Sequence, residues 1–472
     1  SSAGVIWWRA SAACLPSTKA CRRATAEEAL AVELGASGAS AWSKLHESVC
    51  SQIEVEVAVD GQLVRMPISE AGNLMLSPDR EQREAAYLAT QDAWQRWATP
   101  LAAALNGVKG TGVTLAGRRG WSDPVDVACF QNSIDRETLE VMLATTREAF
   151  PHFRRYFRAK ARLIGVGQLA WFDLTAPVGD PGRSWEWLDA VGLLQSEFAA
   201  FSPGLGDLMS RAAAERWIDA GPRPGKEGGA FCSALRAGES RILMNFTPSF
   251  DGVSTLAHEM GHAYHNSCQA DLEPLLRQTP STLAETASTF CETLVFDSLL
   301  SRAEGSERLF MLDQALQTAS QVAVDIISRY DFERALFRLR TAREATIPEL
   351  CDLMTAAQSA TYGDGLDPAR MNRWAWVKTH YYSDQEPFYN FPYLFGQLFG
   401  LGLFAIHQRE PEGFVPRYEL LLRSTGCAEA ADLAAGFGID LRDAAFWRSS
   451  LDTIVRKIDQ FEAMAMALAA TA

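Results

Sequence analysis

The sequence predicts a mainly α-helical protein that contains a small β-sheet. Apolar residues recur at helical spacing over long stretches, at about residues 79–107, 135–163, 184–218 and most of 254–358. Only two short segments are typical of strands, Ile53–Met66 and Arg241–Phe246. The helical stretches are separated by segments rich in Gly and Pro, at 116–124, 175–183 and 221–229. Long helices with so few strands favour helix-on-helix packing around the core.

The first strand candidate is predicted to form a β-hairpin. Ile53–Met66 alternates apolar and polar residues on both sides of Asp60-Gly61, a pair that suits a two-residue hairpin turn. Before it, Ala26–Ser51 has helical spacing, and we expect His46 to be a solvent-exposed residue of that helix. Residues 1–25 show no clean periodicity.

Composition excludes several classes of partner. The net charge of −14 over 472 residues argues against a nucleic-acid backbone and is compatible with neutral or cationic peptides. Nine cysteines, an odd number without a Cys-x-x-Cys pair, indicate reduced thiols and a cytoplasmic protein. The longest apolar run, Phe391–Ile406, is shorter than the ~20 residues that span a membrane. We expect it to be a buried core helix and expect no membrane partner.

A His-Glu-x-x-His motif, His258 to His262, is the strongest chemical signal in the chain. Asp251, Ser254 and Thr255 are candidate N-caps for a helix that carries it. On a helix the two histidines share one face and can bind one Zn²⁺. Glu259 can then act as the general base for a metal-activated water. The alternative is an amphipathic helix with two stacked surface histidines.

Glu285 is the candidate third ligand, because two His, one Glu and an open position form a known hydrolytic zinc site. It follows Thr279–Ala284, which resembles a capped helix start. Alternatively, Thr282 and Glu285 form a capping box in which the glutamate only binds backbone N–H groups. Glu292, two helical turns further on, is expected to orient a ligand histidine or is an ordinary surface charge.

The second strand candidate, Arg241–Phe246, directly precedes the motif helix. As an edge strand it could hold an extended peptide beside the metal, which makes Leu243 and Asn245 candidate substrate-binding residues. Gly229 and Ala230 are further candidates, since the lack of bulky side chains there would let a ligand approach the backbone. Alternatively, the segment is a buried strand of a small sheet.

Two motifs together resemble the thimet-oligopeptidase family of zinc metallopeptidases, and most closely its oligoendopeptidase F branch. They are His-Glu-x-Gly-His-x-x-His at 258–265 and Ala-Glu-Thr-Ala-Ser-Thr-Phe-x-Glu at 284–292. The likeness extends from about Glu27 to the C-terminus. It implies a two-lobed helical metallopeptidase with a deep central cleft and one Zn²⁺ per chain. Family members carry a longer helical N-terminal lobe, so 1–60 is expected to be its remnant and 61–472 the catalytic region.

The resemblance also assigns roles within the aromatic stretch Trp374–Tyr393. A zinc peptidase must stabilise an oxyanion, and His N–H or Tyr O–H groups suit that task. The positions that match the family's cleft-lining groups are His380, Tyr389 and Tyr393, with Tyr382 as a substrate-binding residue that could replace one tyrosine. His265, the last histidine of the first motif, is expected to support the metal ligands together with Glu292.

The resemblance therefore predicts a zinc-dependent endopeptidase that hydrolyses short, unfolded oligopeptides. One alternative is a zinc carboxypeptidase of related helical fold, for which no basic residue stands out as the partner of a terminal carboxylate. Another is a peptide-binding relative without catalysis, which the intact Glu259 argues against.

Overall fold

A computed structural model describes residues 25–59, 61–223, 225–226 and 228–471. Helices hold 70% of the residues and strands 6%, which confirms the mainly α prediction. The N-terminal half contains the helices α2 (Thr25–Ser37), α3 (Ala39–Cys50), α4 (Ile68–Asn73), α5 (Arg80–Arg118), α6 (Pro124–Gln131), α7 (Arg136–Glu148), α8 (Phe150–Leu163), α9 (Trp187–Phe201) and α10 (Pro203–Ala214). The C-terminal half contains α11 (Phe250–Cys268), α12 (Ser281–Ala284), α13 (Thr286–Arg302), α14 (Gly305–Ser320), α15 (Ile326–Ala342), α16 (Ile347–Tyr362), α17 (Phe391–Arg409), α18 (Phe414–Ser424), α19 (Ala430–Ala435) and α20 (Ala444–Thr471).

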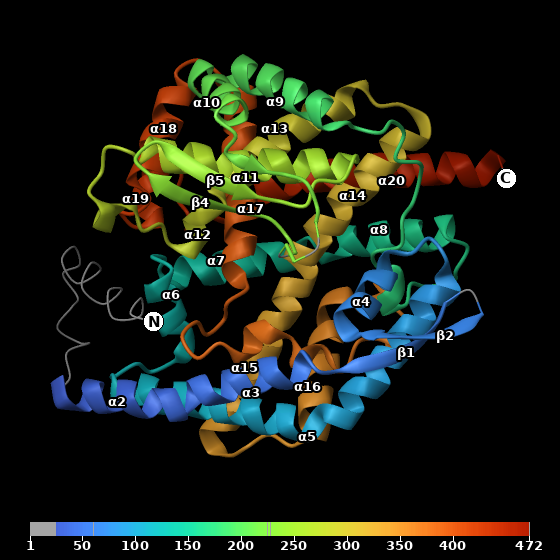
Figure 1. Cartoon of the computed structure of the whole chain (residues 1–472), viewed down its shortest axis with the longest axis vertical. Helices are drawn as coiled ribbons and strands as arrows, with labels where there is room; N and C mark the ends of the chain where they lie inside the picture. The colour runs from blue at the N-terminus through green and yellow to red at the C-terminus, as the bar shows by residue number, and fades with distance from the viewer. Residues whose placement is uncertain (1–24, 60, 224, 227, 472) are drawn as a thin grey trace.

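The helices form two groups (Figure 1), and each group encloses one of the two largest hydrophobic clusters of the described residues. In the smaller group, α5, α15 and α16 enclose a core that includes Phe332, Trp376 and Tyr381. In the larger group, α8, α11, α13, α17 and α20 share a second core. Phe391–Ile406, predicted to be a buried helix, forms most of α17, and its middle is buried. These separate cores are the physical basis of a two-lobed chain.

The predicted hairpin is confirmed as β1 (Glu54–Val59) and β2 (Gln62–Pro67), which pair antiparallel from Glu54↔Pro67 to Val59↔Gln62. Val55 and Val57 are buried, and β1 packs on α5. The boundary predicted between 1–60 and 61–472 falls between these two paired strands and stays a prediction.

The prediction for His46 is wrong. Its side chain is 1% exposed, its Nε2 lies 2.7 Å from the Val377 carbonyl, and its ring stacks on Tyr382. The apolar spacing of 26–51 does not show this, because the packing partner is more than 300 residues away in the chain.

The second sheet contains β3 (Ile218–Asp219), β4 (Phe231–Arg236) and β5 (Glu239–Leu243) in the order β3-β5-β4. The strand candidate 241–246 therefore lies at the centre of the sheet and not at its edge, because a short segment at 218–219 pairs parallel with it. The exposed edge strand is β4, which pairs antiparallel with β5. The sheet packs against α11, as predicted.

Candidate metal centre

The motif helix α11 places both histidines on one face. It begins at Phe250, and Ser249 is its N-cap, since the Ser249 hydroxyl accepts a hydrogen bond from the Gly252 N–H at 3.2 Å. The three predicted caps all lie inside the helix. The His258 and His262 rings lie one turn apart with their centroids 4.9 Å from each other.

A close contact between α11 and α13 brings the third candidate to these histidines. Gly261 faces α13, where a Cβ atom in its place would lie 2.5 Å from the Cα of Ser288. Only glycine therefore fits between His258 and His262 at this crossing. Glu285 stands at the break between α12 and α13, outside regular helix.

The three candidate ligand atoms form a nearly equilateral triangle. Nε2 of His258 lies 3.2 Å from Nε2 of His262 and 3.3 Å from Oε2 of Glu285. The third side, from Nε2 of His262 to Oε2 of Glu285, is 3.5 Å. Tetrahedral coordination with metal–ligand distances of ~2.0–2.1 Å requires sides of about 3.3 Å. This donor set therefore fits Zn²⁺, and the three side chains remain 30, 24 and 21% exposed, open to a substrate.

The capping-box alternative for Glu285 is not formed. The Thr282 hydroxyl donates to the Asn132 carbonyl at 2.6 Å, and α12 has no side-chain cap. The Glu285 carboxylate instead accepts from the Ser288 hydroxyl at 2.7 Å and faces the two histidines.

Glu292 and His265 lie around this triangle in different ways. Oε2 of Glu292 lies 3.4 Å from Nδ1 of His258, the nitrogen that faces away from the triangle, and its Oε1 accepts from the Ser254 hydroxyl at 2.8 Å. His265 is buried, and its Nε2 lies 2.8 Å from the Thr425 hydroxyl. The ring also lies beside the carbonyl of Ala284, the residue before Glu285. One of its contacts is therefore with the backbone that carries a candidate ligand, and another is with Thr425.

Burial and charge set the proton affinities of the metal-free site. Burial raises the pKa of Glu259 to about 7. Oε2 of this carboxylate is buried and has no hydrogen-bond partner among the residues that the structure describes. Burial also lowers the pKa of His262 to about 4. Burial is the largest single influence on the pKa values of His258 and Glu285, and it opposes the charge on each. The other contacts together outweigh it: the hydrogen bonds and charges of Glu285 and Glu292 act on His258, and those of the two histidines and Ser288 act on Glu285. The pKa of His258 rises to about 10 and that of Glu285 falls to about 2.

The two predicted tyrosines lie together near Glu285. Their hydroxyls are 2.8 Å apart, and each side chain is 38% exposed. Burial raises the pKa of Tyr393, as do the bond to Tyr389 and the nearby Glu285 carboxylate. The Tyr393 phenol therefore stays protonated at neutral pH.

His380 lies in a short 3-10 turn, Thr379–Tyr382. Burial and the charge of Arg329 lower its pKa to about 2. The ring is therefore neutral at any working pH. Its Nε2 is buried and, within the described part of the chain, has no hydrogen-bond partner.

Other substrate-binding candidates need correction. Tyr382 is 2% exposed, and its hydroxyl donates to the Leu101 carbonyl, so it belongs to the core of the smaller lobe. Leu243 pairs with Asp219 on one side and with Phe231 on the other, which leaves its backbone no free edge. Both predictions missed partners that are distant in the sequence.

Gly229, Ala230 and Asn245 lie at the start of the edge strand. The Gly229 carbonyl accepts from the Asn245 amide at 3.3 Å. Gly229 has a φ of +83°, so its left-handed backbone alone explains the glycine. These three residues therefore remain candidates only through their place beside β4.

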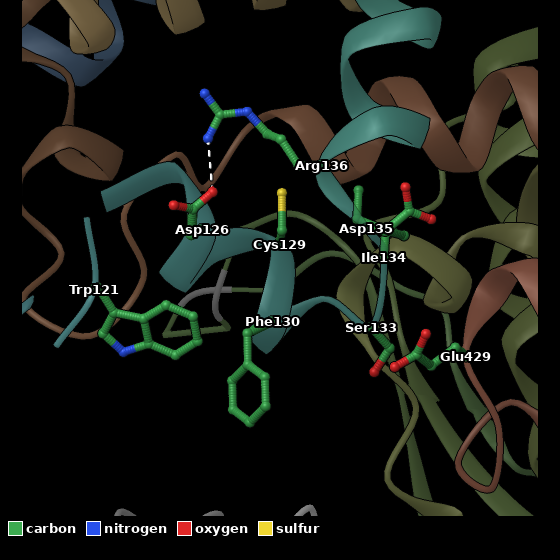
Figure 2. A pocket seen from close by; sticks show the side chains of 9 residues that line it. All are labelled: Trp121, Asp126, Cys129, Phe130, Ser133, Ile134, Asp135, Arg136 and Glu429. Atoms are coloured by element: carbon green, nitrogen blue, oxygen red, sulfur yellow. Dashed lines mark hydrogen bonds and ion pairs between the residues drawn. The ribbon is translucent and has the colours of Figure 1, made fainter. Parts of the chain in front are cut away.

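A cavity of about 260 Å³ is lined by none of the proposed ligands (Figure 2). Its wall includes Cys129, Phe130 and an ion pair between Arg136 and Asp126. The adjoining turn makes two contacts with distant parts of the chain. The Asn132 carbonyl accepts from the Thr282 hydroxyl, and the Gln131 amide donates to the Gln385 carbonyl at 2.9 Å. This turn is a structural support that the sequence did not reveal.

Comparisons with known proteins show the family to which the sequence is similar. A sequence model of peptidase family M3 matches residues 204–453, more than half of the chain. The chain is 23% identical over 414 residues to the chromosomal oligoendopeptidase F of Lactococcus lactis subsp. cremoris, covering 85% of this chain and 67% of that protein. It is 23% identical over 400 residues to oligopeptidase PepF of Bacillus subtilis (strain 168), covering 84% of this chain and 59% of that protein.

The fold also has solved counterparts. The crystal structure of oligoendopeptidase-F from Enterococcus faecium superimposes with a TM-score of 0.72 at 17% identity, covering 94% of this chain and 75% of that one. Within the part of the chain that the structure describes, no helix is long and apolar enough to cross a membrane.

Proposed function

This chain belongs to peptidase family M3, a family of metallopeptidases, and we propose that it is a zinc-dependent endopeptidase acting on short, unfolded peptides. The observation that carries the proposal is the triangle of His258, His262 and Glu285, whose sides of 3.2, 3.3 and 3.5 Å suit one tetrahedral ion. When bound there, Zn²⁺ would supply Lewis-acid chemistry that polarises a peptide carbonyl and acidifies the attacking water. The resemblance to oligoendopeptidases supports the choice of zinc and of peptides.

Glu259 is the proposed general base. It lies directly after His258 and before His262 on α11. Its side chain is buried, and one carboxylate oxygen has no hydrogen-bond partner among the described residues. A carboxylate whose pKa has been raised to about 7 by burial accepts a proton readily near neutral pH. Glu259 would take the proton of the attacking water and then deliver it to the leaving amine.

Tyr389, Tyr393 and His380 are the proposed partners of the oxyanion. All three have an N–H or O–H to donate, and the pKa shifts of His380 and Tyr393 keep these two groups neutral. The tyrosine pair lies next to Glu285. Neutral donors fixed before the reaction stabilise charge as it develops on the carbonyl oxygen.

The edge strand β4 is the proposed binding site for the backbone of the substrate peptide. Phe231, at its start, is 44% exposed, and most of the strand is open to solvent. Burial raises the pKa of Cys232 on β4 to about 12, and the charge of Glu259 adds to this shift, so the strand lies close to the proposed base. An extended peptide added to β4 would run past Glu259.

The proposed activity is tested with a set of peptides blocked at both ends, incubated with the zinc-loaded chain. Mass spectrometry should find internal cuts and two fragments from each cleaved peptide. A carboxypeptidase would instead release single residues, and only from peptides with a free C-terminus. Uncut peptides in the presence of bound zinc would favour a binding protein without catalysis.

Glu292→Gln should weaken zinc binding by about 10–100-fold, because the carboxylate no longer fixes the orientation and tautomer of His258. The zinc affinity is measured by competition with a chromophoric chelator. The matched control is Asp297→Asn on the same helix, whose carboxylate accepts from Gln408 and does not face His258. Equal zinc affinities for the two variants would make Glu292 an ordinary surface charge.

Tyr389→Phe and Tyr393→Phe should each lower kcat by about 10²–10³-fold at full zinc content if their hydroxyls stabilise the transition state. kcat and kcat/KM should fall together, because the interaction forms only as charge develops. The control is Tyr382→Phe, which removes a buried hydroxyl and should shift only the Tm. A kcat within a few-fold of wild type for both test variants would leave the oxyanion to other groups.

A further inference from the structure

Helix α15 contacts the short segment Phe388–Asn390, which carries Tyr389. This segment has an unusual backbone. Phe388 has a φ of +57°, a left-handed conformation that a bulky side chain adopts only when its surroundings impose it. Phe388 and Asn390, on either side of Tyr389, are 2% and 5% exposed, whereas Tyr389 itself is 38% exposed. Two buried residues therefore present one exposed tyrosine.

The first interaction that fixes this segment is a buried ion pair. Nζ of Lys109 lies 2.5 Å from Oε1 of Glu333, and both side chains are 1% exposed. The same glutamate oxygen accepts from the N–H of Phe388 at 3.2 Å. The Phe388 ring lies between Tyr330 and Phe337 of α15, with centroids 5.2 and 5.4 Å away. This pair therefore sets the backbone one residue before Tyr389.

The second interaction that fixes this segment is made by Asn390, one residue after Tyr389. Nη1 of Arg329 donates to the side-chain oxygen of Asn390 at 3.0 Å, and the Arg329 guanidinium is itself fixed by Asp325, to which its Nε donates at 2.8 Å. Asp325 ends a π-helical turn, Gln321–Asp325, between α14 and α15, and such turns occur frequently at functional sites. Asn390 is also the N-cap position of α17.

Helix α17 connects these two interactions to the candidate metal centre. Tyr393 is in its first turn, and a Cβ atom at Gly396, one turn further on, would lie 2.8 Å from the Cβ of Glu285. The hydroxyl pair of Tyr389 and Tyr393 thus joins the segment held by α15 to the helix that packs against a metal ligand.

We propose that Glu333, paired with Lys109, and Arg329, paired with Asp325, are positioning residues that fix the Tyr389 hydroxyl for the reaction by clamping Phe388 and Asn390. The inference rests on the proposed function, because it acts through Tyr389. A displacement of about 1 Å at a catalytic group is enough to cost up to about 10²-fold in rate.

The test compares two double variants that both remove the buried charges. Lys109→Met/Glu333→Gln keeps an oxygen that accepts from Phe388 N–H, whereas Lys109→Met/Glu333→Leu does not. Replacing the pair as a unit avoids leaving an uncompensated buried charge. The Leu variant should show a kcat about 10–100-fold below that of the Gln variant, with unchanged KM and full zinc content.

The same two variants are then measured in a Tyr389→Phe background, where the hydroxyl that they position is missing. The difference in kcat between them should shrink to within about twofold, since coupled residues are not additive. A difference of the same size in both backgrounds, or no difference in the wild-type background, would overturn the proposal. A normal kcat for Tyr389→Phe alone would show instead that the tyrosine role in the proposed function fails.

If the Leu variant does not fold, Asn390→Ala supplies the same test from the other side, because it removes the oxygen that Arg329 holds. Its control is Asp331→Asn, on α15 between Arg329 and Glu333, whose carboxylate pairs with Arg147 and not with the segment. We expect kcat to fall at least about tenfold for Asn390→Ala and to stay unchanged for Asp331→Asn. Equal losses in both variants would mean that α15 contributes only stability.

Discussion

Glu259→Gln is expected to retain zinc and lose nearly all turnover. Glutamine has the same shape as glutamate and can occupy the same buried position, but it cannot accept the proton of the attacking water. General-base catalysis contributes about 10²–10⁴-fold, so kcat should fall by at least that range. Zinc content is measured by elemental analysis, and kcat with a peptide blocked at both ends.

The control for this variant is its stability, which separates the loss of the general base from the loss of a buried charge. Because burial raises the pKa of Glu259, the Gln variant should be at least as stable as wild type at pH 8, where the carboxylate is charged. A stable, zinc-loaded Glu259→Gln protein with near-normal kcat would remove Glu259 from the mechanism.

Glu285→Ala is expected to abolish stable zinc binding, and with it the activity. One of the three proposed protein ligands is lost, so the loss of zinc affinity should exceed the ~10–100-fold expected when a residue that only orients a ligand is changed. Because zinc stabilises only the folded chain, the Tm of this variant should equal that of the chelated wild type. Zinc per chain is measured after dialysis.

Ser288→Ala is the matched control for Glu285→Ala. It removes a hydroxyl that donates to the Glu285 carboxylate at 2.7 Å but leaves all three ligands in place, so it should keep one zinc per chain. If Glu285→Ala also kept a full complement, the third ligand would have to be another residue, with Glu292 the nearest candidate.

The features that the sequence predicted well depend on local patterns. The spacing of His258 and His262 follows from helical geometry, and the hairpin around Asp60-Gly61 follows from turn chemistry. Glu285 was predicted from a known donor set and a motif. Its place at a break between two helices was not, because Thr282 bonds to a residue 150 positions away and not to the expected cap.

The features that the sequence did not reveal depend on contacts between distant parts of the chain. Lys109 and Glu333 are 224 residues apart, and neither belongs to a motif. The central position of β5 follows from a two-residue strand at 218–219, too short to produce a periodic pattern. The burial of Tyr382 against His46 likewise has no local signal.

The most direct test of a single catalytic zinc ion is a titration of the metal-free chain with Zn²⁺, following hydrolysis of a peptide blocked at both ends. The triangle of two histidines and one glutamate predicts no hydrolysis in chelator, and a rate that rises linearly and stops at one zinc per chain. A rate that is unaffected by the chelator would contradict it.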